Sequence, residues 1–108
     1  MDLIQIGAEI LHCAKRLQKA GNELYKMGEA KAKSEQIYRV KLSQEMLKLK
    51  SECMSIGMIG DVAKGNVAEY LFQRDYDEVR WKAAIESVDA IKCQLSAYQS
   101  LLKYQDVI

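Results

Sequence analysis

Two columns of residues that repeat every seven positions run through the first quarter of the chain. One column holds large aliphatic residues: Leu3, Ile10, Leu17 and Leu24. The other column holds small residues: Gly7, Ala14, Gly21 and Gly28. A strict seven-residue repeat keeps one side of a helix turned toward a partner helix. Because an interior glycine costs a helix roughly 1 kcal/mol relative to alanine, we expect the small column to mark a close helix–helix contact.

The composition favours helices throughout. The 108 residues include no proline, and alanine, leucine, lysine, glutamate and glutamine, which all favour helix, are frequent. This length is typical of one domain with a modest core. We therefore expect a single all-α domain over residues 1–108.

Three segments organise this domain. A first helix is expected from about residue 2, where Asp2 is a good N-cap, to about residue 53. A break at Gly21-Asn22 is the alternative, but the seven-residue register passes that point unshifted. Glycines mark a bend or short helix at about 55–65, and a second long helix follows at about 67–104. The predicted architecture is a long, coiled-coil-like antiparallel helical hairpin.

The second long helix carries its own seven-residue columns. They are Trp81, Val88, Leu95 and Leu102, and Ala84, Ile91 and Tyr98. A fold at about residue 58 brings polar positions of the two helices level, and we expect them to form an ionic layer within the apolar seam: Glu35, Arg39, Arg74 and Asp77. Such a layer can fix register or partner choice.

The chain holds more apolar residues than one seam between two helices can cover. We therefore expect the hairpin to form a homodimer or to dock on a larger protein, because an isolated helix pair buries little surface. Ile56, Met58 and Ile59 lie at the expected bend. They are candidates for a partner-binding tip, with capping of the hairpin core as the alternative.

Charge and cysteine usage limit the cellular context. The formal net charge is +1, which gives no general attraction to nucleic acid or membrane. Three widely spaced cysteines, Cys13, Cys53 and Cys93, are typical of free thiols in a reducing cytoplasm. No apolar run approaches 18 residues, and the N-terminus does not resemble a signal peptide. We expect a cytoplasmic protein without a membrane segment.

The motifs of common enzymes are missing. His12 and Cys13 are adjacent, so on a helix they point about 100° apart and do not form a nucleophilic pair. The acidic residues from Asp61 to Glu78 lack the Glu-x-x-His pattern of metal-binding bundles. Lys64-Gly65 is not followed by the Ser or Thr of a P-loop. We expect no enzymatic activity, no metal and no cofactor.

The sequence favours protein binding over nucleic-acid binding. The short segment and the helix from Val67 loosely resemble a helix-turn-helix, but the reader helix would present Glu69, Gln73 and Asp75 among few basic residues. Nucleic acid is therefore a possible partner that the sequence does not favour.

Five segments resemble a family of small helical proteins encoded by phages and prophages, mainly of Gram-positive hosts. They are Glu35-x-x-Tyr38-Arg39, Ile59 to Ala68, Phe72-x-Arg74-Asp75, Ala83 to Ser87 and Gln94 to Ser100. The resemblance implies a phage protein that works inside the bacterial cell by binding a host or phage protein. An inhibitor of a host defence system, such as a CRISPR effector, is one such role. An accessory of phage recombination or replication, and a virion assembly protein, are the alternatives.

Overall fold

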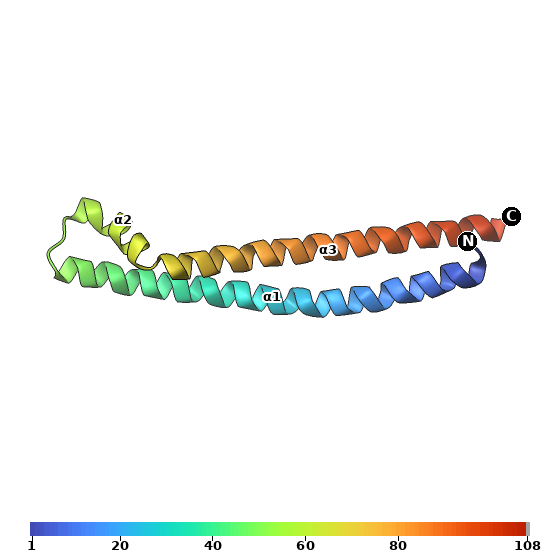
Figure 1. Ribbon diagram of the computed structural model, residues 1–108, viewed down its shortest axis with the longest axis horizontal. Helices are drawn as coiled ribbons and strands as arrows, with labels where there is room; N and C mark the ends of the chain where they lie inside the picture. The colour runs from blue at the N-terminus through green and yellow to red at the C-terminus, as the bar shows by residue number, and fades with distance from the viewer. Residues whose placement is uncertain (108) are drawn as a thin grey trace. The chain divides into compact units, whose positions relative to one another are not determined.

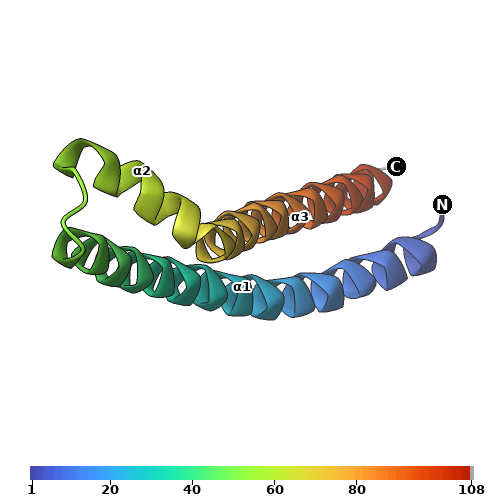
Figure 2. The same ribbon diagram turned by 60° about the vertical axis from the view of Figure 1, so that its left-hand side comes forward.

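The computed structural model describes residues 1–107, which form three helices: α1 (Leu3–Ser51), α2 (Ile56–Asn66) and α3 (Ala68–Val107). No strand occurs within this range. Within each of the two compact units described below, the segments of α1 and α3 run antiparallel and side by side, and α2 lies between the two helices in the chain (Figures 1 and 2). The predicted all-α helical hairpin with a short helix at the bend is confirmed.

Helix α1 begins with a reciprocal pair of side-chain caps. The Asp2 carboxylate accepts a hydrogen bond from the backbone N–H of Gln5 at 2.8 Å, and the Gln5 side chain accepts one from the backbone N–H of Asp2 at 3.0 Å. This capping box satisfies donors that the first helical turn leaves free. The helix then continues without a break through Gly21-Asn22 for 49 residues, so the predicted continuity is confirmed.

Helix α1 ends in a Schellman motif. Cys53 has a φ of 62°, the left-handed conformation that glycine usually occupies at this position. The N–H of Met54 donates to the carbonyl of Leu49, and the N–H of Cys53 donates to the carbonyl of Lys50. Leu49 and Met54 also pack in the same apolar cluster, so the motif includes its usual hydrophobic contact.

The helices divide between two compact units. Unit 1 combines Met1–Lys26 with Lys82–Ile108, and unit 2 comprises Met27–Trp81. Unit 1 thus pairs the first half of α1 with most of α3, whereas unit 2 contains α2 and the helix segments on either side of it. Whether they form one domain, as the sequence predicts, stays a prediction.

In unit 1 the seam between α1 and α3 is apolar. Ile6 and Cys13 of α1 are fully or almost fully buried, and Val88 and Ile91 of α3 are buried with them. Arg16 donates a hydrogen bond of 2.9 Å to the Gln94 side chain at the edge of the seam. The columns predicted for the second long helix are confirmed, because all their members are buried or half-buried.

The predicted role of the small column is wrong for most of its members. Gly7, Ala14 and Gly21 are exposed, and a Cβ added to either glycine would meet no described atom within 4 Å beyond the neighbouring residues and the backbone of its own helix. At Gly28, an added Cβ would lie 3.4 Å from Nε1 of Trp81, within unit 2. Close packing on α3 therefore holds only at Gly28.

Helix geometry explains this difference. In the first half of α1 the seam uses Ile6 and Cys13, each one residue before a member of the small column. An α-helix has 3.6 residues per turn, so its contact face drifts about 20° per heptad relative to a strict seven-residue repeat. The seam reaches the small column only at Gly28 and follows it to Leu42, which is half-buried, and Leu49, which is buried.

In unit 2, α2 folds back onto the end of α1 (Figure 1). Leu49 of α1 forms a buried cluster with Ile59 and Ala63 of α2. Glu45 accepts a 2.8 Å hydrogen bond from the Asn66 side chain at the end of α2. The apolar cluster and this bond fix α2 as a packed helix instead of a loop.

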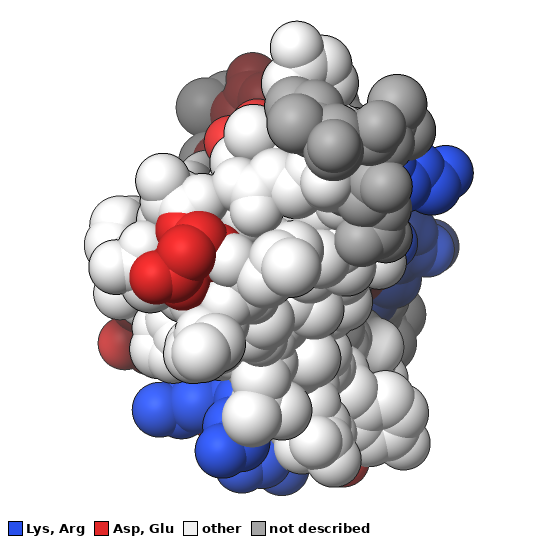
Figure 3. All heavy atoms as spheres, turned by 90° about the vertical axis from the view of Figure 1, so that its right-hand side faces the viewer, with Lys and Arg blue, Asp and Glu red and all other residues white. Residues whose placement is uncertain are grey.

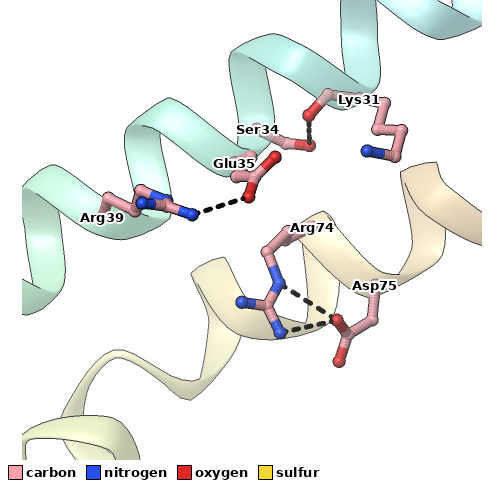
Figure 4. A network of polar contacts seen from close by, with 6 residues as sticks. All are labelled: Lys31, Ser34, Glu35, Arg39, Arg74 and Asp75. Carbon is pink, nitrogen blue, oxygen red and sulfur yellow. Dashed lines mark hydrogen bonds and ion pairs between the residues drawn. The ribbon is translucent and has the colours of Figure 1, made fainter.

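The predicted ionic layer is present only in part. Asp77 is buried, and Glu35 and Arg74 are half-buried, whereas Arg39 is exposed. The ion pairs that these residues form lie within single helices: Arg39 with Glu35 at 3.1 Å, and Arg74 with Asp75 at 3.0 Å (Figure 4). Asp77 accepts a 3.0 Å hydrogen bond from Gln73 of its own helix.

The register of the helices accounts for the missing cross-helix ion pair. The Arg74 guanidinium lies 4.6 Å from the ring centroid of Tyr38, and the Lys31 ammonium lies 5.2 Å from that of Trp81. These partners are about one helical turn earlier in α1 than a fold at residue 58 predicts. The chain reverses earlier, in the turn between Ser51 and Ile56, so Arg74 and Lys31 meet aromatic rings of the opposite helix.

Candidate protein-binding surface

The predicted tip is exposed at two of its three residues. Ile56 is 86% exposed and Met58 is 58% exposed, both on α2. Ile59, at 7%, lies in the buried cluster with Leu49 and Ala63. The prediction that Ile59 contacts a partner is therefore corrected, because one side of a short amphipathic helix covers the core while the other remains outside.

A second apolar surface lies on the outer face of α3 in unit 2. Phe72, Tyr76 and Val79 are 67%, 48% and 64% exposed. Their spacing of four and three residues places them on one side of the helix. The opposite side carries Arg74 and Trp81, which contact α1. We call Phe72, Tyr76 and Val79 the outer α3 surface.

The aromatic side chains of this surface contact each other and a neighbouring arginine. The rings of Phe72 and Tyr76 stack with centroids 6.0 Å apart and planes inclined by 9°. The Arg80 guanidinium lies 5.6 Å from the centroid of the Tyr76 ring. Aromatic residues and arginine are enriched in the energetic centres of protein interfaces. Preordered side chains lose little conformational entropy when a partner binds.

The outer α3 surface was absent from the sequence-based candidates, although the sequence contains its signal. The positions 72, 76 and 79 follow the same helical spacing as a seam, but the true seam of α3 runs through other positions. Only the burial of Arg74, Asp77 and Trp81 decides which of the two stripes faces α1.

The residues weighed as catalytic or metal-ligating candidates do not lie together in the described structure. His12 is exposed and Cys13 is buried in the seam with α3. No group of three or more His, Cys, Asp or Glu residues within residues 1–107 has the arrangement of a metal site.

A hollow of about 710 Å³ lies at the end of unit 1 that carries both termini, and its lining consists of Met1, Asp2, Leu3, Ile4 and Gln105. Residues other than Lys, Arg, Asp and Glu make up most of the surface visible from this end (Figure 3). The Asp2 carboxylate is engaged in the cap of α1, and the Gln105 side chain donates a hydrogen bond to the carbonyl of Met1. The polar groups of the hollow are therefore occupied by hydrogen bonds to the first residues of the chain.

Several aromatic rings of unit 2 are covered by basic side chains of the same unit. Lys31 lies over Trp81, Lys41 lies over Tyr70 and Arg74 lies over Tyr38. A basic side chain over one face of a ring competes with a nucleic-acid base for that face, and base stacking is how single strands are usually held. On the outer α3 surface Tyr76 likewise lies under a basic side chain, that of Arg80, and its ring stacks on that of Phe72.

Comparison of the chain with protein-family models, curated proteins and solved structures finds no significant match. No helix of the described residues combines the length and the apolar character needed to cross a bilayer.

Proposed function

We propose that the chain is a non-enzymatic binding protein that contacts another protein through unit 2. The observation that carries this proposal is the outer α3 surface, where three large apolar side chains of one helix face are about half to two-thirds exposed. Exposed apolar groups that lie together are typical of interaction sites. Phe72 and Tyr76 are the anchors, and the exposed Ile56 and Met58 of α2 are a second contact in the same unit.

A helix face of this type fits an apolar groove on a protein partner. Such recognition uses side chains at spacings of three, four and seven residues, and the positions 72, 76 and 79 provide all three. The resemblance to small phage proteins extends the proposal to the identity of the partner. It would be a host protein, such as a component of a defence system that the chain inhibits.

A pair of matched variants tests this function. Phe72→Ser removes an anchor, and Leu47→Ser changes a side chain of nearly equal exposure, 67% against 68%, on α1 of the same unit. Loss of an interface anchor costs about 2 kcal/mol or more, so Phe72→Ser should weaken binding by roughly thirtyfold. Leu47→Ser should bind like the wild type. The measurement is the amount of one partner recovered from host lysate by equal amounts of each variant.

Nuclease treatment of the same lysate separates protein from nucleic acid as the partner. Recovery that is unchanged by nuclease and lost in Phe72→Ser supports the proposal. Recovery that disappears with nuclease, together with a gel shift whose affinity falls steeply with salt, would replace it with nucleic-acid binding. Equal recovery by Phe72→Ser and the wild type would refute the assigned surface.

A further inference from the structure

In unit 1 the glycines of the small column of α1, Gly7 and Gly21, pack against no other described helix. Gly7 and Gly21 lie inside a helix, where each glycine costs stability, yet no described atom beyond the neighbouring residues and the backbone of the same helix comes within 4 Å of a Cβ added to either. Large apolar residues alternate with them on the same side of the helix: Ile4, Leu11 and Tyr25 are 85%, 57% and 76% exposed. We call this side of α1 the Ile4–Tyr25 face.

The Ile4–Tyr25 face consists of two heptad columns. The columns are Ile4, Leu11, Gln18 and Tyr25, and Gly7, Ala14 and Gly21. Helix α1 has six charged residues between Leu3 and Lys26, and none of them falls in either column: Glu9, Lys15, Arg16, Lys19, Glu23 and Lys26. A solvated helix face normally carries charge. An uncharged, exposed and partly apolar face is typical of a helix that meets another helix.

We infer that a second copy of this chain docks on the Ile4–Tyr25 face, with its α1 antiparallel to the first. This inference is independent of the proposed function, because it concerns unit 1 and not the outer α3 surface. In an antiparallel pair related by a twofold axis, the large column of one copy faces the small column of the other.

The spacing of the residues supports this pairing layer by layer. When Leu11 lies opposite Gly21 of the second copy, Tyr25 lies opposite Gly7, and Gln18 lies opposite Ala14. Every layer then joins one large and one small residue, and the twofold axis repeats each layer. The missing side chains of the glycines let the two backbones approach closely enough for the large side chains to fill the space.

The large exposed side chains supply about half of the area that such a contact needs. At on the order of 100–150 Å² for each large exposed side chain, Ile4, Leu11 and Tyr25 offer about 400 Å² per copy. This is half of the roughly 800 Å² that each partner of a standard interface buries. The small column, Gln18 and the half-buried Ile10 and Leu17 lie beside them and contribute the remaining contact.

The first test measures the mass of the chain in solution by sedimentation equilibrium over a dilution series. The wild type should approach the mass of two chains. Gly21→Gln should dissociate at least tenfold more readily, because its side chain occupies the space that Leu11 of the second copy needs. Its helicity should be kept or raised, because the site is open within the chain. Gly65→Gln is the matched control, since Gly65 in α2 is equally open, and it should remain a dimer.

The second test measures the direction of the two helices. In chains with Cys53 and Cys93 changed to Ser, a short bis-maleimide reagent should cross-link Gln18→Cys and not Ile4→Cys. Residue 18 lies near its counterpart in the antiparallel pair, whereas the two copies of residue 4 are separated by about 24 residues, or roughly 36 Å. A mass of one chain at all concentrations, an unchanged dimer in Gly21→Gln, or cross-linking at position 4 would each overturn the inference.

Discussion

At the scale of single residues, the end of α1 depends on one unusual backbone conformation. Cys53 is the only residue within 1–107 other than glycine that has a positive φ, at 62°, and no described glycine has one. The glycines around residues 57 to 65 indicated a bend near this region, but they lie within α2, after the turn between Ser51 and Ile56. They did not identify the turning residue, because a cysteine in the left-handed conformation carries no compositional signal.

This conformation leads to a prediction for Cys53→Gly. Glycine adopts a positive φ without the steric cost that a Cβ imposes, so the variant should raise the free energy of unfolding by about 0.5–1 kcal/mol. The control is Cys93→Gly, the same change inside α3, where glycine should lower it by a few tenths of a kcal/mol. Chemical denaturation monitored by circular dichroism measures both. A loss of stability in Cys53→Gly would contradict the assigned role of this residue.

At the scale of helices, the pattern of the sequence predicted which helices form. It did not predict which side of α1 faces α3. The columns of α3 were predicted correctly because Trp81, Val88 and Leu95 coincide with the seam. In α1 the most regular repeat, Gly7 to Gly28, was assigned to the seam with α3, but Cys13 is buried there and Ala14 is exposed. A periodic pattern shows that a face meets a partner, but it does not say whether that partner is another segment of the same chain.

The helix register in unit 2 gives a prediction for Arg74. Its guanidinium lies over the buried ring of Tyr38 and pairs with Asp75, so Arg74→Ala removes a cation–π contact and the packing of the aliphatic stem. We expect the free energy of unfolding to fall by about 1 kcal/mol. Lys33→Ala, at an exposed position of α1, should change it by less than about 0.5 kcal/mol. Equal melting temperatures for the two variants would argue against this register.

At the scale of the whole molecule, each unit buries one side of its helices and leaves another apolar side exposed. The sequence predicted this surplus of apolar residues, since one seam cannot cover them all. The sequence could not assign these apolar residues to particular surfaces. The outer α3 surface and the Ile4–Tyr25 face can be told apart from the seam only when the burial of each residue is known. The predicted tip shows the same limit, with Ile56 exposed and Ile59 buried.

The reactivity of the three native thiols tests the central claim, that the Ile6–Cys13 side of α1 faces α3 while the glycine side faces outward. Cys13 is 1% exposed, whereas Cys53 and Cys93 are exposed. Titration of the folded protein with Ellman's reagent should modify Cys53 and Cys93 rapidly, and Cys13 should react only when the protein unfolds. Rapid modification of all three thiols in the folded protein would contradict the account.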